Sequence, residues 1–162
     1  MSKLLIVADL EDKCAATPRG LQLAELMDLQ PEVVAFTYAN LRRLKLDRAG
    51  TAAVKKQLLD QRRAAATAHV EKHKSANQRV KVSVVWAEQI HSWITKRAAG
   101  DYAAVVKTRH QSESLGHMST DWHLLRECPA PVLLVGKRKW KKGGDIIATV
   151  DLDAGSKVKR DL

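Results

Sequence analysis

The feature that most constrains the fold of this chain is the alternation of short apolar runs with longer, helix-like segments. Runs of strand length stand at residues 4–8, 33–38, 80–86, 102–106 and 132–135. The first is continuously apolar and is closed by Asp9, which is typical of a central strand covered on both faces. Because strands separated by helices connect through right-handed crossovers, the sequence predicts an α/β fold with an open, parallel, five-stranded sheet and helices on both faces.

The first expected helix begins with Thr17 and Pro18, a pair typical of a cap and a first helical turn. Three of its apolar residues recur on one helical face: Leu23, Leu26 and Met27. Pro31 is expected to end this helix.

The longest expected helix covers residues 51–76, which are rich in Ala, Lys, Gln and Arg. Its narrow inward-facing stripe consists of Val54, Leu58, Ala65 and His69. Shorter helices are expected before Gly100 and between Ser119 or Thr120 and Pro129.

Ligands of such sheets bind beyond the carboxyl ends of the strands, where the strand order reverses. Asp9 and the loop after Val106 are therefore the places where the pattern predicts a site.

A stretch near the end of the chain repeats its beginning. Residues 4–12 read LLIVADLED and residues 146–153 read IIATVDLD, so an apolar run and the acidic residue that closes it both recur. We expect three parts: a domain at 1–136, a basic linker at 137–144, and the start of a second, incomplete repeat at 145–162. The extra strand of that repeat, at 146–150, should add to a sheet because its backbone groups need partners.

The 162 residues are 45% hydrophobic, which suits one domain with its own core. No apolar run approaches the roughly 20 residues of a membrane helix, and the first residues lack the features of a signal peptide. Cys14 and Cys128 have no CxxC partner, so neither a disulfide framework nor a zinc knuckle is expected. The sequence predicts a soluble, cytoplasmic protein without a membrane partner.

The net charge of +10 is concentrated in two groups of basic residues. The first group is interpreted as a solvated helix face: Arg42, Arg43, Lys45, Arg48, Lys55, Lys56, Arg62 and Arg63. The second is interpreted as the linker: Lys137, Arg138, Lys139, Lys141 and Lys142. A nucleic-acid surface normally adds aromatic stacking platforms, and only 4% of residues are aromatic. Specific nucleic-acid binding is therefore not expected.

Three segments resemble the universal stress protein family. They are LLIVADLED, DYAAVVK and STDWHLLRECPAPVLLVG, the last of which is similar to the CPVLVV-like segment that ends the final helix and strand of that family. Within it, TDWHLLRECPAPV is closer still to the first domain of members that join two domains in one chain. The resemblance implies the adenine-nucleotide alpha-hydrolase-like sheet, and it implies that residues 145–162 open a second domain.

Nucleotide-binding members of the family carry an Asp after the first strand and a G-x2-G-x9-G-(S/T) loop, whose glycines let backbone amides approach phosphates. Asp9 and Ser119 match this pattern, but Met118 stands at the glycine before Ser119, and neither earlier glycine is present. Lys107 and Arg109 are able to hold an anion by charge alone. The resemblance thus implies a degenerate nucleotide or anion site, with no cofactor and no ATP expected.

Other constellations do not predict catalysis or a metal. On one helix Ser119 and His123 share a face while Asp121 points away, so these residues do not form a relay. His69 and His73 have zinc-ligand spacing, but no third ligand is apparent.

The sequence therefore predicts a stress-response binding and regulatory module that is not an enzyme. The resemblance suggests that the fifth strand pairs with its equivalent in a homodimer or in a second domain, through Val132, Leu133, Leu134 and Val135. Two alternatives stay open: an ATP- or anion-binding switch, and nonspecific nucleic-acid binding by the basic surface.

Overall fold

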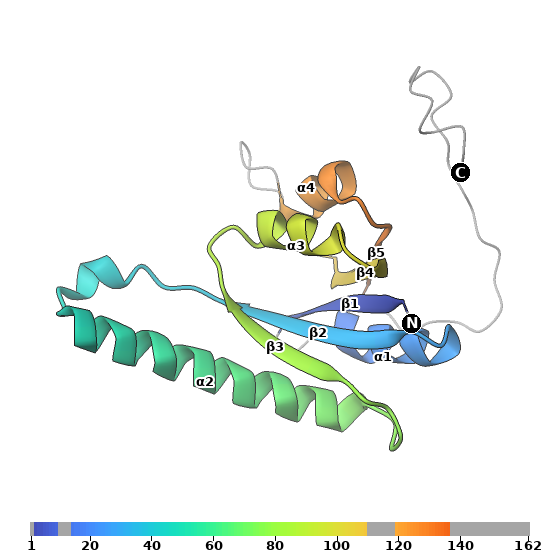
Figure 1. The fold of residues 1–162 in the computed structure, drawn as a ribbon, viewed down its shortest axis with the longest axis horizontal. Helices are drawn as coiled ribbons and strands as arrows, with labels where there is room; N and C mark the ends of the chain where they lie inside the picture. The colour runs from blue at the N-terminus through green and yellow to red at the C-terminus, as the bar shows by residue number, and fades with distance from the viewer. Residues whose placement is uncertain (1, 10–13, 110–118, 137–162) are drawn as a thin grey trace.

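The computed structural model describes residues 2–9, 14–109 and 119–136 (Figure 1). The elements follow in the order β1 (Lys3–Ala8), α1 (Ala16–Leu26), β2 (Gln30–Thr37), the 3-10 helix η1 (Leu41–Leu44), α2 (Arg48–His73), β3 (Lys81–Trp86), α3 (Ile90–Ala98), β4 (Tyr102–Thr108), α4 (Thr120–Glu127) and β5 (Val132–Val135). The expected linker at 137–144 and strand at 146–150 lie outside the described residues. No helix within the described ranges combines the length and the apolar character needed to cross a membrane.

The five strands form one parallel sheet in the order β3-β2-β1-β4-β5. Ile6 in the central strand β1 is in register with Val33 of β2 on one side and Val106 of β4 on the other. The chain builds the sheet outward from β1 through β2 and β3, and then returns to the other side of β1 with β4. The predicted parallel sheet is confirmed, and its order reverses between β1 and β4.

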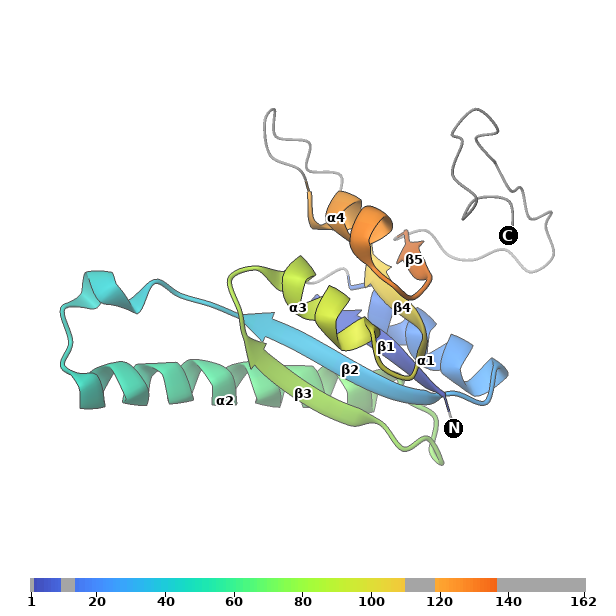
Figure 2. The same ribbon diagram turned by 45° about the horizontal axis from the view of Figure 1, so that its top comes forward.

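Helices cover both faces of this sheet, as predicted (Figure 2). Because successive residues of a strand point to opposite faces, β1 feeds two cores. Leu4 and Ile6 pack in the core beneath α1 and α2, whereas Leu5 and Val7 pack in the core beneath α3 and α4.

Helix α1 differs from its sequence-based expectation at its start. It begins at Ala16, and Thr17 is fully buried inside its first turn rather than capping it. The backbone N–H groups of Ala15 and Ala16 donate instead to the Thr108 hydroxyl, at 3.2 and 3.0 Å. The cap of α1 is therefore supplied by the end of β4.

The end and the face of α1 also differ from expectation. The helix ends at Leu26, and Asp28 adopts a left-handed conformation with φ of 51°, so Pro31 does not end the helix but lies in β2. Leu26 and Met27 are exposed, and the buried face carries Leu21 and Ala24.

Gly20 permits the close approach of α1 to the sheet. A Cβ atom at this position would lie 2.6 Å from Cγ1 of Ile6, whose side chain is fully buried. Only a residue without a side chain fits this contact.

Helix α2 is capped by Asp47, whose carboxylate accepts from the N–H of Gly50 at 2.7 Å. Its amino-terminal half extends past the carboxyl ends of β2 and β3 (Figure 1). Its buried residues are Ala66 and Val70, so the predicted stripe is wrong at Ala65, which is exposed.

A buried carboxylate stands near the start of β2. Glu32, 3% exposed, accepts from Arg97 of α3 at 2.9 and 3.3 Å and from the Tyr102 hydroxyl of β4 at 2.9 Å. Lys81 of β3 lies 3.4 Å away. Burial acts to raise the pKa of Glu32, but the hydrogen bonds from Tyr102 and Arg97 and the charges of Arg97 and Lys81 outweigh it, so the pKa lies below its ordinary value. This carboxylate ties together β2, β3, β4 and α3.

Candidate functional site

The predicted site lies where β1 and β4 end side by side. Val7 of β1 is in register with Lys107 of β4, Asp9 follows β1, and Arg109 follows β4. The strand order reverses between these two strands, which is the position where ligands of open parallel sheets bind. The structure thus brings three of the four predicted site residues to one edge of the sheet.

Lys107 is directed into the protein rather than toward solvent. Its ammonium lies 2.7 Å from Oδ1 of Asp121 in the first turn of α4, and it also donates to the carbonyl of Thr108 at 3.0 Å. The side chains of Lys107 and Asp121 are 6% and 9% exposed. The cation expected to attract an anion is therefore already neutralised by a buried carboxylate.

Sequence reasoning missed the role of Asp121. In the sequence, its direction away from Ser119 and His123 indicates only that it takes no part in a catalytic relay. Two features of the sequence could have indicated its pairing with Lys107. Asp121 is an acidic residue in a first helical turn, where the helix dipole favours negative charge, and Lys107 stands at the end of a strand.

Ser119 is the N-cap of α4. Its hydroxyl accepts from the backbone N–H of Trp122 at 3.4 Å. Arg109 is exposed at its side chain, and its backbone N–H donates to the carbonyl of Val135 at 3.0 Å. The loop at 110–118, where the family's glycines would stand, lies outside the described residues.

The first N–H groups of α1 also face this edge, and they are bonded to Thr108. A free helix N-terminus beside a parallel sheet is a ready site for phosphate. Here the Thr108 hydroxyl occupies that position, a role that no sequence signal near α1 indicated.

The histidines in the described part of the chain are not arranged as a catalytic relay or a three-ligand metal centre. His123 stacks on His91 with ring centroids 4.1 Å apart, and its Nδ1 lies 3.3 Å from Glu127. The rings of His69 and His73 are 4.8 Å apart, and burial first, then neighbouring positive charge, lowers the pKa of both. Across residues 2–9, 14–109 and 119–136, no group of three or more His, Cys, Asp or Glu side chains could hold a metal ion.

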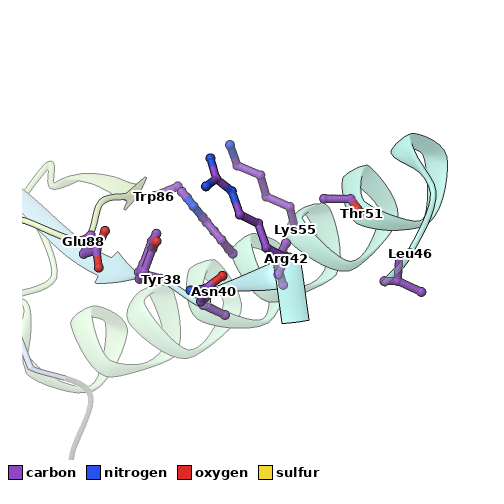
Figure 3. A pocket seen from close by; sticks show the side chains of 10 residues that line it. Tyr38, Asn40, Arg42, Leu46, Thr51, Lys55, Trp86 and Glu88 are labelled. Atoms are coloured by element: carbon purple, nitrogen blue, oxygen red, sulfur yellow. The ribbon is translucent and has the colours of Figure 1, made fainter. Parts of the chain in front are cut away.

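A separate cavity of about 640 Å³ opens beyond the carboxyl ends of β2 and β3 (Figure 3). It is lined by Tyr38, Ala39, Asn40, Leu41, Arg42, Leu46, Thr51, Lys55, Trp86 and Glu88. No local sequence pattern indicates this aromatic cavity, because Tyr38 and Trp86 are far apart in the chain.

Strand β5 forms one edge of the sheet. Leu133 on it is 38% exposed, and Trp122 and Leu125 on α4 are 56% and 52% exposed. Trp122 therefore does not lie in the core, and this part of the surface presents apolar side chains beside a strand edge.

Comparison of sequences finds relatives for part of the chain. It is 32% identical over 104 residues to universal stress protein E of Salmonella typhi, a match that covers 62% of this chain and 33% of that protein. A homologue in Haemophilus influenzae is 28% identical over 100 residues, with 59% and 32% covered. The matched segment thus spans about a third of the length of these relatives. No family model matches the chain.

Comparison of structures finds the same fold along most of the chain. A universal stress protein from Lactobacillus plantarum superposes with a TM-score of 0.58 at 15% identity, covering 83% of this chain and 97% of that one. A universal stress protein solved in complex with cAMP gives a TM-score of 0.55 at 13% identity, with 85% and 98% covered. At these identities the likeness establishes the fold, and the predicted architecture is confirmed.

Proposed function

Because this chain belongs to the universal stress protein family, we propose that it is a stress-response domain that acts as a non-catalytic binding and regulatory module with a degenerate nucleotide site. The module works in the cytoplasm and carries no cofactor or metal. It acts through pairing with another domain of its kind.

The buried pair of Lys107 and Asp121 is the observation that carries this proposal. A phosphate entering the edge between β1 and β4 would have to compete with a carboxylate 2.7 Å from the lysine ammonium. It would also find the first N–H groups of α1 bonded to Thr108. Both contacts support a site whose anion-binding groups are satisfied from within the protein.

The second candidate function is a nucleotide- or anion-binding switch at Asp9, Lys107, Arg109 and Ser119. The observation that favours it is the solved relative in complex with cAMP, which shares the fold. In this chain, ligand binding would require the Lys107–Asp121 pair to open.

We expect Asp9→Ala and Ser119→Ala, singly and together, to leave the affinity for ATP and for cAMP unchanged. The physical reason is that the charge of Lys107 is already neutralised, and that the Ser119 hydroxyl accepts from a helix N–H. Isothermal titration calorimetry of the wild type and the three variants makes this measurement. Micromolar binding that disappears in the double variant contradicts the proposal and favours the switch.

The partner in this proposal binds at β5. Among the described strands, none pairs with the outer edge of β5, and symmetric pairing of the residues of β5 in two copies would cover that edge. The same edge would serve a second domain of a longer chain.

We expect the chain to sediment as a homodimer and Leu133→Lys to sediment as a monomer. A lysine on the paired edge would place two like charges close together across the symmetry axis. Leu44→Lys in η1 is the matched control, since Leu44 is 53% exposed and lies away from β5. A wild type that stays monomeric at high concentration, or equal dissociation in both variants, contradicts pairing through β5.

A further inference from the structure

The cavity beyond β2 and β3 combines an aromatic surface with exposed cations. Tyr38 follows β2 and Trp86 ends β3, and their ring centroids are 5.8 Å apart at an interplanar angle of 59°. The Nζ atom of Lys55 lies 5.3 Å from the centroid of the Trp86 ring. Two of the chain's few aromatic side chains are therefore gathered at a single hollow.

The charges in this cavity are separated. Arg42 and Lys55 project on one side of Trp86, and Glu88 lies beside Tyr38 on the other (Figure 3). The hydrogen bond from the Tyr38 hydroxyl to Glu88 raises the pKa of Tyr38 and holds the carboxylate at that end. An elongated ligand would thus meet positive charge at one end and hydrogen-bond acceptors at the other.

This combination matches a nucleobase that carries a phosphate. Aromatic side chains stack on every base, and cations beside them hold the phosphate. The amide of Asn40 and the carboxylate of Glu88 can bond to the edge of the base. A cavity of about 640 Å³ has the size of an ordinary small-ligand site.

We propose that this cavity is a binding site for a nucleotide unit, whose base packs against Trp86 and Tyr38 while its phosphate lies between Arg42 and Lys55. The site shares no residue with Asp9, Lys107, Arg109 or Ser119, so it is independent of the function proposed above. Free nucleotides and single-stranded nucleic acid both carry this chemistry.

Aromatic residues are scarce in this chain, which is why specific nucleic-acid binding is not expected from the sequence. A stacking site, however, needs two or three rings at one place rather than many in the chain, and the structure brings Tyr38 and Trp86 together. The basic group at 42–63, interpreted as a solvated helix face, includes the two cations that line this cavity.

The test uses two probes on the whole chain. AMP is titrated by calorimetry, and a fluorescein-labelled single-stranded DNA of about ten nucleotides, a length within the range one small domain covers, is titrated by fluorescence anisotropy at low salt. The informative variant is Arg42→Gln with Lys55→Gln. Its matched control is Arg43→Gln with Lys56→Gln, which removes the same charge from neighbouring exposed positions outside the cavity.

We expect the double variant Arg42→Gln with Lys55→Gln to lower the affinity about tenfold or more. The control double variant should have a much smaller effect. Trp86→Leu should weaken binding similarly, whereas Trp122→Leu, at an exposed position on α4, should not. If the DNA binds far more tightly than AMP, the ligand of this cavity is single-stranded nucleic acid. If the two probes bind with equal affinity, the ligand is a free nucleotide. The proposal is overturned if neither probe binds at millimolar concentration, or if the two charge pairs weaken binding equally.

Discussion

Replacing Asp121 with asparagine is expected to lower the free energy of unfolding by about 3–5 kcal/mol. The substitution keeps the shape of the side chain and removes the carboxylate 2.7 Å from the ammonium of Lys107. Because Lys107 is 6% exposed at its side chain, water cannot replace that carboxylate. Urea unfolding followed by circular dichroism gives the measurement, and a loss below about 1 kcal/mol, the range of exposed pairs, contradicts the buried pairing.

Two further variants make this test specific. Glu127→Gln removes an exposed carboxylate from the other end of α4 and should change stability by well under about 1 kcal/mol. Lys107→Met combined with Asp121→Leu replaces both charges by apolar groups, and it should recover most of the stability lost by Asp121→Asn.

The Asp121→Asn variant also connects stability to anion binding. With Asp121 neutral, the charge of Lys107 is no longer balanced by that residue, and an added anion has a reason to bind there. Inorganic phosphate should therefore raise the melting temperature of Asp121→Asn more than that of the wild type. An equal rise in both would mean that Asp121 does not keep anions out of the edge between β1 and β4.

Replacing Arg97 with leucine is expected to cost about 3 kcal/mol, near the lower end of the range for broken buried pairs. Glu32 would lose its shortest charged contact, at 2.9 Å, and keep only Lys81 and the Tyr102 hydroxyl. Lys81→Leu is the matched control, because Lys81 is 58% exposed and lies 3.4 Å from the carboxylate, and it should cost less than about 1 kcal/mol. Adding Glu32→Gln to Arg97→Leu should restore part of the loss, since a neutral amide needs no cation.

The effect of Arg97→Leu should depend on pH. The pKa of Glu32 lies below its ordinary value of 4.5 in the folded protein, so its contribution to stability is fully present above about pH 4.5 and is lost as the pH falls through the folded pKa. The difference between the wild type and Arg97→Leu should therefore shrink in acid. A difference that stays constant from neutral pH to below pH 4 would contradict the ionic origin of the effect.

The fold was predictable because its main signals are local. The apolar run at 4–8 and the helix-length segments between such runs are visible in any window of the sequence, and they dictate a parallel sheet. The start of α1 was not predictable, because its cap is Thr108, 92 residues away from Ala16. Such a partner becomes known only when the strand order is known.

The positions of the candidate site residues were predictable, but their contacts were not. Asp9, Lys107 and Arg109 were expected at the edge that the structure shows. The pairing of Lys107 with Asp121 depends on how α4 is rotated about its axis. The spacing of residues in the sequence does not determine that rotation. Glu32 was missed for a related reason: within the run PEVVAF it is the single charged residue, and its partners come from three other elements.

The last two residues of β4 point to opposite layers of the fold. Lys107 bonds with α4 on one face of the sheet, and Thr108 bonds with α1 on the other. The two helical layers are therefore not independent modules for protein engineering. A chimera that takes α1 or α4 from a relative must also take, or recreate, the dipeptide at 107–108. The reason is that the donor Lys107, which contacts α4, and the acceptor Thr108, which contacts α1, are consecutive in the chain.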